Sequence, residues 1–230
     1  MNRQIKGLLY FCVADAKRSL LIFWTILIGF VTLGVLIALF LMTGENDKMI
    51  MSIPFAVYIY SSIFGFLTVK QSIPFAIKMG ATRKNLFIGL AVFLVGLSIF
   101  QAILINIIQS IYEFVCQQIS IDAMEFMSLG GFLDNTWLTS ITVEASVIFF
   151  IMTLDYMLGL LFYKYGLPGG GGILGVALVM LLYGFSEGFL IDFANSIIES
   201  FDIMLFFEVA GIGFLIYILS WGMVRKITIE

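Results

Sequence analysis

The sequence predicts an all-α integral membrane protein with six transmembrane helices, preceded by an N-terminal interfacial helix. Of the 230 residues, 61% are hydrophobic and 12% are charged, and the mean hydropathy is +1.10. A soluble globular chain is about 45–50% apolar and about 25% charged. The apolar residues form six long runs, and Lys and Arg are concentrated in alternate connections between these runs. These observations exclude a soluble domain.

Six apolar runs reach the length of about 20 residues that a spanning helix needs. They are Leu20–Met42, Ile50–Val69, Leu86–Ile111, Ile141–Tyr163, Ile173–Ile191 and Ile203–Met223. The first run is too long, and too far from the N-terminus, to be the apolar part of a cleavable signal peptide. We therefore expect residues 1–230 to form a single transmembrane domain.

The positive residues predict the orientation of these spans. Eleven of the twelve Lys and Arg residues lie at the termini or in the second and fourth connections: Arg3, Lys6, Lys17, Arg18, Lys70, Lys78, Arg83, Lys84, Lys164, Arg225 and Lys226. The first connection holds the twelfth, Lys48. Because cytoplasmic loops carry the excess of Lys and Arg, we expect a multi-pass protein of the cell (plasma) membrane with both termini cytoplasmic.

Acidic residues are concentrated in or beside the outer connections. They are Glu45, Asp47, Glu113, Asp122, Glu125, Asp134, Glu187, Asp192, Glu199 and Asp202. Asp and Glu contribute little to topology, so these positions are either simply tolerated or form an outer face that attracts cations through its local potential. The sequence leaves both interpretations open.

Residues 1–18 are expected to form a helix before the first span. Apolar residues recur at helical spacing, with basic residues around them: Ile5, Leu8, Leu9, Cys12 and Ala16. This pattern favours an amphipathic helix that lies in the inner membrane interface. The alternative is a cytosolic extension of the first transmembrane helix.

The connection Gln71–Lys84, between the second and third spans, carries helix signals of its own. Ser72 suits an N-cap with Pro74 in the first turn. Gly80 suits the left-handed position after a helix end, and Thr82 suits the N-cap of the next helix. These signals predict a separate short helix near residues 71–80.

Three apolar side chains on that short helix, Phe75, Ile77 and Met79, would be exposed to water unless another molecule covers them. Lys78, Arg83 and Lys84 make the same segment positive. The sequence therefore predicts that a cytosolic partner docks here.

The residues of this connection resemble the loop between the second and third spans of ABC-2-type ABC exporter permeases, in particular the small six-span permeases of Gram-positive bacteria. The similarity lies in Pro74-Phe75, in Met79-Gly80-Ala81-Thr82-Arg83-Lys84 and in Phe87-Ile88-Gly89. In that family the loop is a cytoplasmic coupling helix, which sits in a groove of the ATPase subunit. The resemblance implies that an ATPase contacts Pro74, Phe75, Ile77, Lys78, Met79, Gly80, Ala81, Thr82, Arg83 and Lys84.

The resemblance also implies the partners and cargo of such a subunit. Two copies of the chain, or one copy and a homologous permease, would form the pore within membrane lipid. A separate cytosolic ABC ATPase would bind ATP and Mg²⁺. Small permeases of this kind often export amphipathic peptides, including antimicrobial peptides and phenol-soluble modulins.

The segment Ser186–Asp202 resembles another family element, a short helix between the fifth and sixth spans that dips into the outer leaflet. Its apolar residues fall near helical spacing: Phe189, Leu190, Phe193, Ile197 and Phe201. A loop that extends the fifth helix is the alternative.

Several polar residues lie within the spans, where charge is costly and usually faces a cavity or a partner. Glu144 and Glu208 lie near the outer ends of their spans, whereas Asp155 lies deeper and is a candidate for the pore or the dimer interface. Gln101, Asn106 and Gln109 on the third span either join helices by hydrogen bonds or line a path for substrate.

Several kinds of chemistry are excluded or disfavoured. The chain has no His, the commonest general base and metal ligand, so we expect no enzyme, no metal site and no nucleic-acid partner. Cys12 and Cys116 are expected on opposite sides of the membrane, without a disulfide. Gly170–Gly175 matches G-x-G-x-x-G, but that motif needs a preceding strand. We interpret Leu167–Gly172 as a flexible cytoplasmic turn, in which Pro168 stops the helix.

Three functions are compatible with the sequence. The resemblance favours the permease subunit of an ATP-driven exporter of amphipathic or hydrophobic cargo. A secondary transporter or channel would need ion sites near the membrane midplane and often repeated halves, and only Asp155 is a candidate for such a site. The third function is a membrane sensor or assembly subunit that transports nothing.

Overall fold

The chain is almost entirely helical, which confirms the all-α prediction. A computed structural model describes residues 3–41, 49–119, 124–133, 136–199 and 201–225. The helices are α1 (Arg3–Leu41), α2 (Ile53–Lys78), α3 (Arg83–Gln118), α4 (Trp137–Ser186), α5 (Phe189–Glu199) and α6 (Ile203–Val224). Of the charged residues used for orientation, Glu45, Asp47, Lys48, Asp122, Asp134 and Lys226 lie outside the described residues.

Within the described ranges, five helices are long and apolar enough to cross a membrane: α1, α2, α3, α4 and α6. The sequence predicted six, and the difference lies in α4. This helix has 50 residues and takes in the fourth predicted span and most of the fifth. It would be about 75 Å long if it were straight, whereas the hydrocarbon core of a membrane is about 30 Å thick.

Gly166 bends α4 sharply. Its backbone has φ 67° and ψ −172°, a conformation essentially restricted to glycine. The bend divides α4 into a first arm, residues 137–165, and a second arm, residues 167–186. Pro168 lies at the start of the second arm, where its missing N–H costs little. The predicted flexible turn over Leu167–Gly172 is therefore wrong, because the single residue Gly166 makes the bend and the helix resumes at once.

The glycines after the bend allow the second arm to start close to the first. An ideal Cβ at Gly169 would lie 2.4 Å from the Cβ of Tyr165, and one at Gly170 would lie 2.6 Å from the Phe162 ring. The G-x-G-x-x-G match is thus α-helical and follows a helix. Of its three glycines, only Gly170 makes a close approach, since added Cβ atoms at Gly172 and Gly175 would have nothing within 4 Å.

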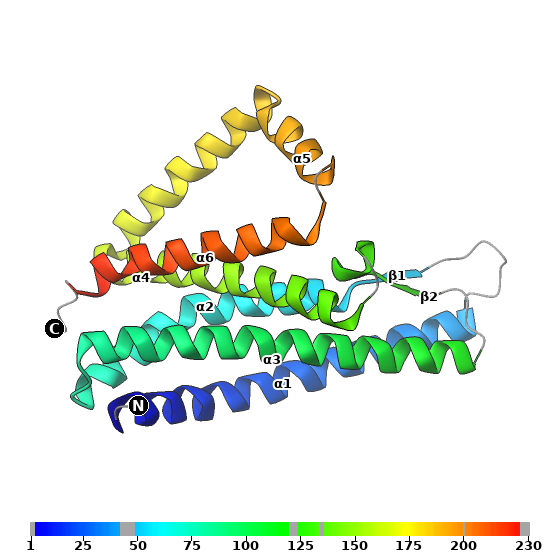
Figure 1. Cartoon of the computed structure of the whole chain (residues 1–230), viewed down its shortest axis with the longest axis horizontal. Coiled ribbons are helices and arrows are strands. Elements are labelled where there is room, and N and C mark those ends of the chain that lie inside the picture. Colours follow the sequence, from blue (N-terminus) through cyan, green and yellow to red (C-terminus); the bar gives the residue numbers. More distant parts are fainter. Residues whose placement is uncertain (1–2, 42–48, 120–123, 134–135, 200, 226–230) are drawn as a thin grey trace.

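Both termini lie at one end of a bundle of long helices (Figure 1). The α2–α3 connection and the bend in α4 lie at the same end, which we call the N/C end. The first arm of α4 runs through the bundle, and α4 contacts α2, α3 and α6. The second arm leaves the bundle obliquely, and α5 returns toward the start of α6.

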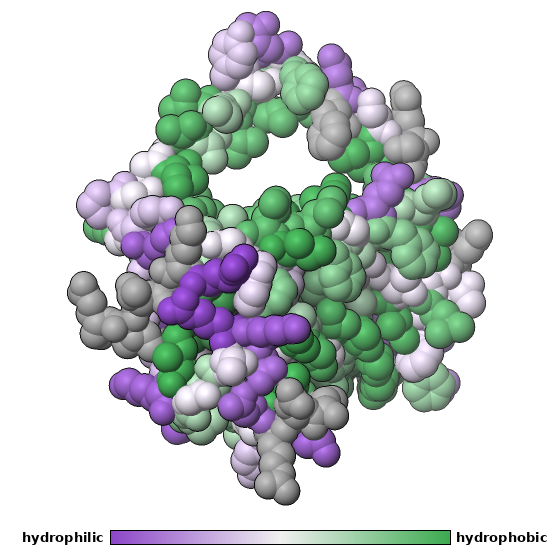
Figure 2. Space-filling view, turned by 60° about the vertical axis from the view of Figure 1, so that its left-hand side comes forward, coloured by the Kyte–Doolittle hydropathy of each residue, from purple (hydrophilic) through white to green (hydrophobic). Residues whose placement is uncertain are grey.

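The surface follows this arrangement. Figure 2 shows hydrophilic residues gathered at the N/C end and hydrophobic residues on the flank beside it. An open window separates the second arm of α4 and α5 from the rest of the molecule, and much of its rim is hydrophobic (Figure 2).

A pair of short strands at the opposite end, which we call the strand end, was not predicted. β1 (Met49–Met51) and β2 (Met124–Phe126) are parallel, and Met49, Ile50 and Met51 pair with Met124, Glu125 and Phe126. A 3₁₀ turn, η1 (Gly130–Phe132), follows β2. Strands of three residues are too short for an alternating pattern to stand out in a sequence. The pair joins the α1–α2 connection to the α3–α4 connection.

The N-terminal segment differs from its prediction. α1 is one helix from Arg3 to Leu41, with no separate interfacial helix. The apolar face that includes Leu8 and Cys12 is buried because it packs against protein. The Cys12 Sγ lies 3.8 Å from the Ser72 Oγ on α2, and a Cβ at Gly89 on α3 would lie 2.6 Å from Leu8. The structure agrees with the alternative interpretation of the sequence, in which this segment extends the helix of the first span.

The segment between the fifth and sixth predicted spans contains a helix, α5. Gly188, with φ 79°, separates it from α4. Asp202 then begins α6, because its Oδ1 accepts a hydrogen bond of 2.6 Å from the N–H of Ile203. The predicted helix within Ser186–Asp202 is therefore present, and its depth in a membrane stays a prediction.

Candidate functional site

The α2–α3 turn, which we define as Lys78–Lys84, ends one helix and begins the next with well-defined hydrogen bonds. Gly80 has φ 73°. The Ala81 N–H donates to the Ala76 oxygen at 3.0 Å and the Gly80 N–H to the Ile77 oxygen at 2.9 Å, the two bonds of a Schellman motif. The Thr82 hydroxyl accepts from the Asn85 N–H at 3.3 Å. The predicted roles of Gly80 and Thr82 are confirmed.

The start of the predicted coupling helix is wrong. α2 continues without a break from Ile53 to Lys78 and carries Pro74 in its interior. Ser72 is a buried residue of this helix next to Cys12 on α1, not an N-cap. The sequence signals at Ser72 and Pro74 suit a helix start, but apolar contacts with α1 and α3 hold the longer helix together despite the proline.

The exposure predicted for Phe75 and Ile77 is also wrong. The Phe75 ring stacks on Phe11 of α1, with ring centroids 3.5 Å apart, and Ile77 is half-buried against the core. Met79 is 53% exposed. The N-terminal part of α1 supplies the cover, because it packs against the end of α2.

Both ends of the chain hold the α2–α3 turn in place. The Gln4 amide of α1 donates to the Gly80 oxygen at 3.3 Å and accepts from the Asn85 amide at 2.5 Å. The Arg83 guanidinium donates to the Arg225 backbone oxygen at the end of α6. Lys78, Met79, Thr82, Arg83 and Lys84 are exposed, while Pro74 and Ala81 are half-buried.

Two of the predicted polar residues join helices inside the bundle. Gln101 of α3 is fully buried, and its Oε1 accepts from the Ser61 hydroxyl of α2 at 2.7 Å. Glu144 of α4 is 1% exposed, and its Oε2 accepts from the Tyr58 hydroxyl of α2. We call these four residues the buried polar layer; it links α2 to both α3 and α4.

The buried polar layer is incompletely paired. Among the described residues, the Gln101 Nε2 and the Glu144 Oε1 are buried without a geometrically suitable hydrogen-bond partner. The Tyr156 hydroxyl, on the first arm of α4, is likewise buried without a hydrogen-bond partner among the described residues. Partly paired polar groups in an apolar interior destabilise the arrangement that holds them.

The other predicted polar residues lie apart from this layer. Asp155 is half-buried on α4, and its carboxylate has the Ser62 hydroxyl of α2 as a hydrogen-bonding partner. Asn106 donates to the Ala102 oxygen at 2.9 Å, and Gln109 donates to Glu113 at 2.8 Å. Both of these bonds stay within α3. Glu208 is exposed on α6.

Sequence reasoning missed the α2 side of these contacts. Tyr58 lies one turn before Ser61 and Ser62 on α2. The Tyr58 and Ser61 hydroxyls donate to Glu144 and Gln101, respectively, and Ser62 lies beside Asp155. Hydroxyl side chains are common in apolar helices, and they often bond to their own backbone, as Thr68 does here. The signal that marks them is their spacing of three and four residues on one helix face.

The described residues hold no group of three or more Cys, Asp or Glu that could bind a metal ion. Cys12 and Cys116 are buried, one near each end of the bundle. Comparison with known protein families, with curated proteins and with solved structures finds no match for this chain.

Proposed function

We propose that the chain is the transmembrane permease subunit of an ATP-driven ABC exporter in the plasma membrane. A separate cytosolic ATPase docks on the α2–α3 turn, and the cargo is amphipathic or hydrophobic, such as a peptide. Two copies, or one copy and a homologous permease, form the pore. The resemblance of this turn to the coupling loop of ABC-2 permeases is the starting point.

The path of the chain supports six membrane crossings. α1 starts and α6 ends at the N/C end (Figure 1), which supports an even number of crossings. α1, α2, α3 and α6 each cross once, and the two arms of α4 cross separately, the second together with α5. The positive residues gather at the N/C end, which therefore faces the cytoplasm.

One observation carries the docking proposal: the α2–α3 turn is hydrogen-bonded to α1 and α6 and bears an exposed apolar side chain between two cations. Met79 is 53% exposed, and Lys78 and Lys84 flank it. The turn is bound to α1 through Gln4 and to α6 through Arg83. A force on this turn therefore acts on α2 and α3, and the buried polar layer connects both to α4.

The proposed ATPase contact is smaller than the segment that the sequence suggested. Phe75 and Ile77 face α1 and the core, so they position the turn without touching the partner. The contact then comes from Lys78, Met79, Gly80 and Lys84. A methionine suits such a surface because its flexible side chain adapts to a partner's groove.

Site-specific cross-linking tests the proposal. A photo-reactive amino acid at Met79 is expected to form an adduct with a P-loop ATPase in membranes of the native host, identified by mass spectrometry. The matched control places the same amino acid at Leu167, which is 78% exposed at the same end of the bundle. Met79→Asp is expected to remove ATPase co-purification, and Leu167→Asp to leave it intact.

An adduct at Leu167 but not at Met79 contradicts docking on the α2–α3 turn. If neither position captures an ATPase and none co-purifies, the chain works without one. The secondary transporter then becomes the better candidate, with Asp155 as the residue to test. Unchanged transport by a well-expressed Asp155→Asn variant removes that role.

A further inference from the structure

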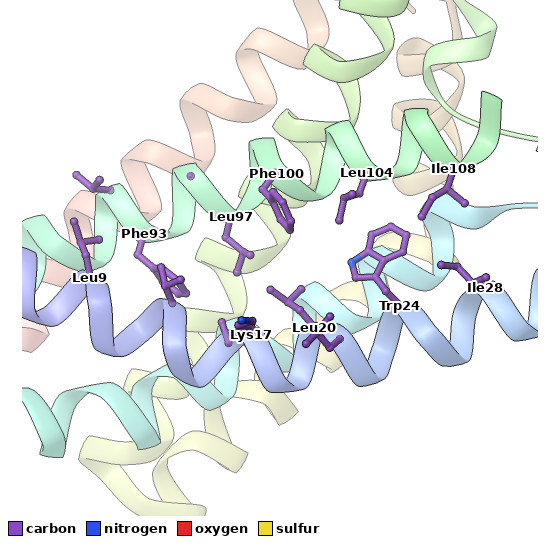
Figure 3. A pocket seen from close by; sticks show the side chains of 15 residues that line it. Leu9, Lys17, Leu20, Trp24, Ile28, Phe93, Leu97, Phe100, Leu104 and Ile108 are labelled. Carbon is purple, nitrogen blue, oxygen red and sulfur yellow. The ribbon is translucent and has the colours of Figure 1, made fainter. Parts of the chain in front are cut away.

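A groove runs along the side of the bundle between α1 and α3 (Figure 3). Its volume is about 750 Å³, and its fifteen lining residues all come from these two helices. The rim is open, since Leu21 is 59% and Phe100 49% exposed. We call it the α1–α3 groove. Its volume lies within the range of about 300–1,000 Å³ that is typical of small-molecule sites.

Two polar groups stand out in this apolar groove. Lys17 is the one charged residue of the lining. Trp24 is 7% exposed, and its indole N–H has no hydrogen-bond partner among the described residues. Figure 3 shows the indole nitrogen on the edge of the ring that faces Lys17. A buried donor without a partner destabilises the fold, and a ligand with an acceptor removes this penalty.

The distance between Lys17 and Trp24 along α1 matches the difference in depth between lipid headgroups and the outer part of the hydrocarbon. They are seven residues apart, two helical turns, so they share a face of α1 about 10 Å apart along its axis. No charged residue follows Lys17 and Arg18 on α1, and residues 20–41 span about 33 Å. Lys17 therefore lies at the level of the lipid headgroups, and Trp24 lies within the hydrocarbon.

We propose that the α1–α3 groove binds one anionic phospholipid. The phosphate lies at Lys17, the indole N–H of Trp24 donates to an ester carbonyl, and an acyl chain lies on Leu104 and Ile108 beyond it. From Lys17 toward Ile108, the groove presents a cation, a hydrogen-bond donor and an apolar wall, in the same order as the phosphate, ester and acyl chain of a phospholipid. On the other side of Lys17 the apolar lining continues with Leu9 and Phe93 (Figure 3). Lys17 reaches the headgroup because long cationic side chains extend along apolar surface toward water.

A peptide fits the same groove less well. Every backbone N–H and C=O of a segment in lipid needs a partner, and apart from Lys17 and Trp24 the lining side chains are Leu, Val, Ala, Ile, Phe and Gly. An acyl chain has no such groups to satisfy. The proposal does not depend on an ATPase or on transport.

Fluorescence quenching by brominated lipids tests it. Trp137→Phe and Trp221→Phe leave Trp24 as the single tryptophan of the full chain, which is reconstituted in vesicles of phosphatidylcholine or phosphatidylglycerol with brominated acyl chains. Brominated phosphatidylglycerol is expected to associate about fivefold more strongly, the effect of one cation near the membrane surface. Equal quenching by the two lipids overturns the proposal.

Neighbouring cations provide a matched control. Lys17→Gln is expected to abolish the preference for phosphatidylglycerol, whereas Arg18→Gln, one residue along and outside the lining, is expected to keep it. An equal loss in both variants means that surface charge alone attracts the lipid, and it contradicts the groove site.

A third variant blocks the groove itself. Gly96→Phe fills the groove, since no atom lies within 4 Å of an added Cβ, and it is expected to weaken quenching by both lipids.

Native mass spectrometry provides a second readout that does not use tryptophan fluorescence. The original chain is expected to retain ester-linked phosphatidylglycerol more strongly than its ether-linked analogue, which lacks the carbonyl. Trp24→Phe is expected to remove this difference. If the two lipids are retained equally, or if an acidic amphipathic peptide binds the groove with higher affinity and displaces both lipids, the phospholipid assignment is wrong.

Discussion

Gln101 shows how a single side chain can both join and weaken the bundle. It is fully buried on α3, and its oxygen accepts from Ser61 on α2. Its amide nitrogen has no partner among the described residues. An interhelical hydrogen bond in a membrane protein contributes about 0.6 kcal/mol on average, whereas an unpaired buried donor costs more. The two effects can be separated by substitution.

We expect Ser61→Ala to destabilise the protein and Gln101→Leu to be neutral or stabilising. Ser61→Ala leaves both polar atoms of the Gln101 amide unpaired, while Gln101→Leu removes them together and leaves Ser61 able to bond to its own helix. Thermal unfolding in detergent, followed by the monodisperse fraction, measures the difference. A larger loss for Gln101→Leu than for Ser61→Ala would show that the bond outweighs the unpaired nitrogen.

Single residues were predictable where the signal is local. Gly80 and Thr82 follow from capping rules that need only a few neighbouring residues. The contacts of Phe75 and Gln101 depend on α1 and α2, which lie far away in sequence. The sequence shows the size of Phe75 and the polarity of Gln101, but it does not show which residues they contact.

Among the helices, the first arm of α4 packs unusually closely against α2 and α6. A Cβ at Gly65 of α2 would lie 2.5 Å from the Met152 oxygen, and one at Gly159 of α4 would lie 2.8 Å from the Phe66 oxygen. At Gly213 of α6 the nearest atoms would be 3.2 Å away. Small residues let helices in membranes approach closely and gain van der Waals contact.

Gly65→Ala is expected to destabilise the bundle by about 1–3 kcal/mol, the usual effect of an overpacked core. Backbone atoms of α4 would have to move to admit the new methyl group. Gly29→Ala is the control, because no atom lies within 4 Å of its added Cβ and alanine favours a helix by about 0.5–1 kcal/mol. Equal unfolding temperatures for the two variants would contradict close α2–α4 contact.

The bend in α4 gives a separate prediction. Gly166→Ala forces a side chain into a conformation that costs about 1–3 kcal/mol, so we expect a lower unfolding temperature or a changed bend. Gly171→Ala, in the helical part of the same glycine run and with open space around it, is expected to be neutral or stabilising. Circular dichroism and thermal unfolding of both variants measure the contrast.

Hydropathy predicted the apolar runs but not the full lengths of the helices. Apolar runs end at charged residues, whereas α1 and α3, with 39 and 36 residues, continue past them for several turns. The N-terminal extension of α1 packs against α2 and the start of α3, and Tyr112, in the C-terminal extension of α3, forms a hydrogen bond with Thr32 of α1. The sequence also could not distinguish a loop at Leu167–Gly172 from a one-residue bend, because Gly and Pro are common to both.

For the whole molecule, the position of the two ends of the chain is the main constraint on the membrane topology. α1 starts and α6 ends at the N/C end (Figure 1), and this is compatible with an even number of crossings. Cysteine labelling can test the resulting topology cleanly. Cys12 and Cys116 are buried, so they contribute little background and can be replaced.

In a cysteine-free variant, a cysteine at Met127 near the strand end is expected to react with an impermeant thiol reagent on intact cells. One at Leu167 is expected to react only after the membrane is opened. Both positions are exposed, at 45% and 78%. Reaction of Leu167→Cys on intact cells would place the α4 bend outside and contradict the six-crossing topology.

The strand pair has a mechanical consequence for the bundle. β1 and β2 tie the α1–α2 hairpin to the α3–α4 hairpin at the strand end, so these hairpins cannot separate there without breaking backbone hydrogen bonds. At the N/C end, α1 is held to the α2–α3 turn by the Gln4 side chain. The two hairpins are therefore joined at both ends, so neither end of the bundle can open without breaking hydrogen bonds. The α1–α3 groove is accessible instead from the side, between exposed rim residues such as Leu21 and Phe100.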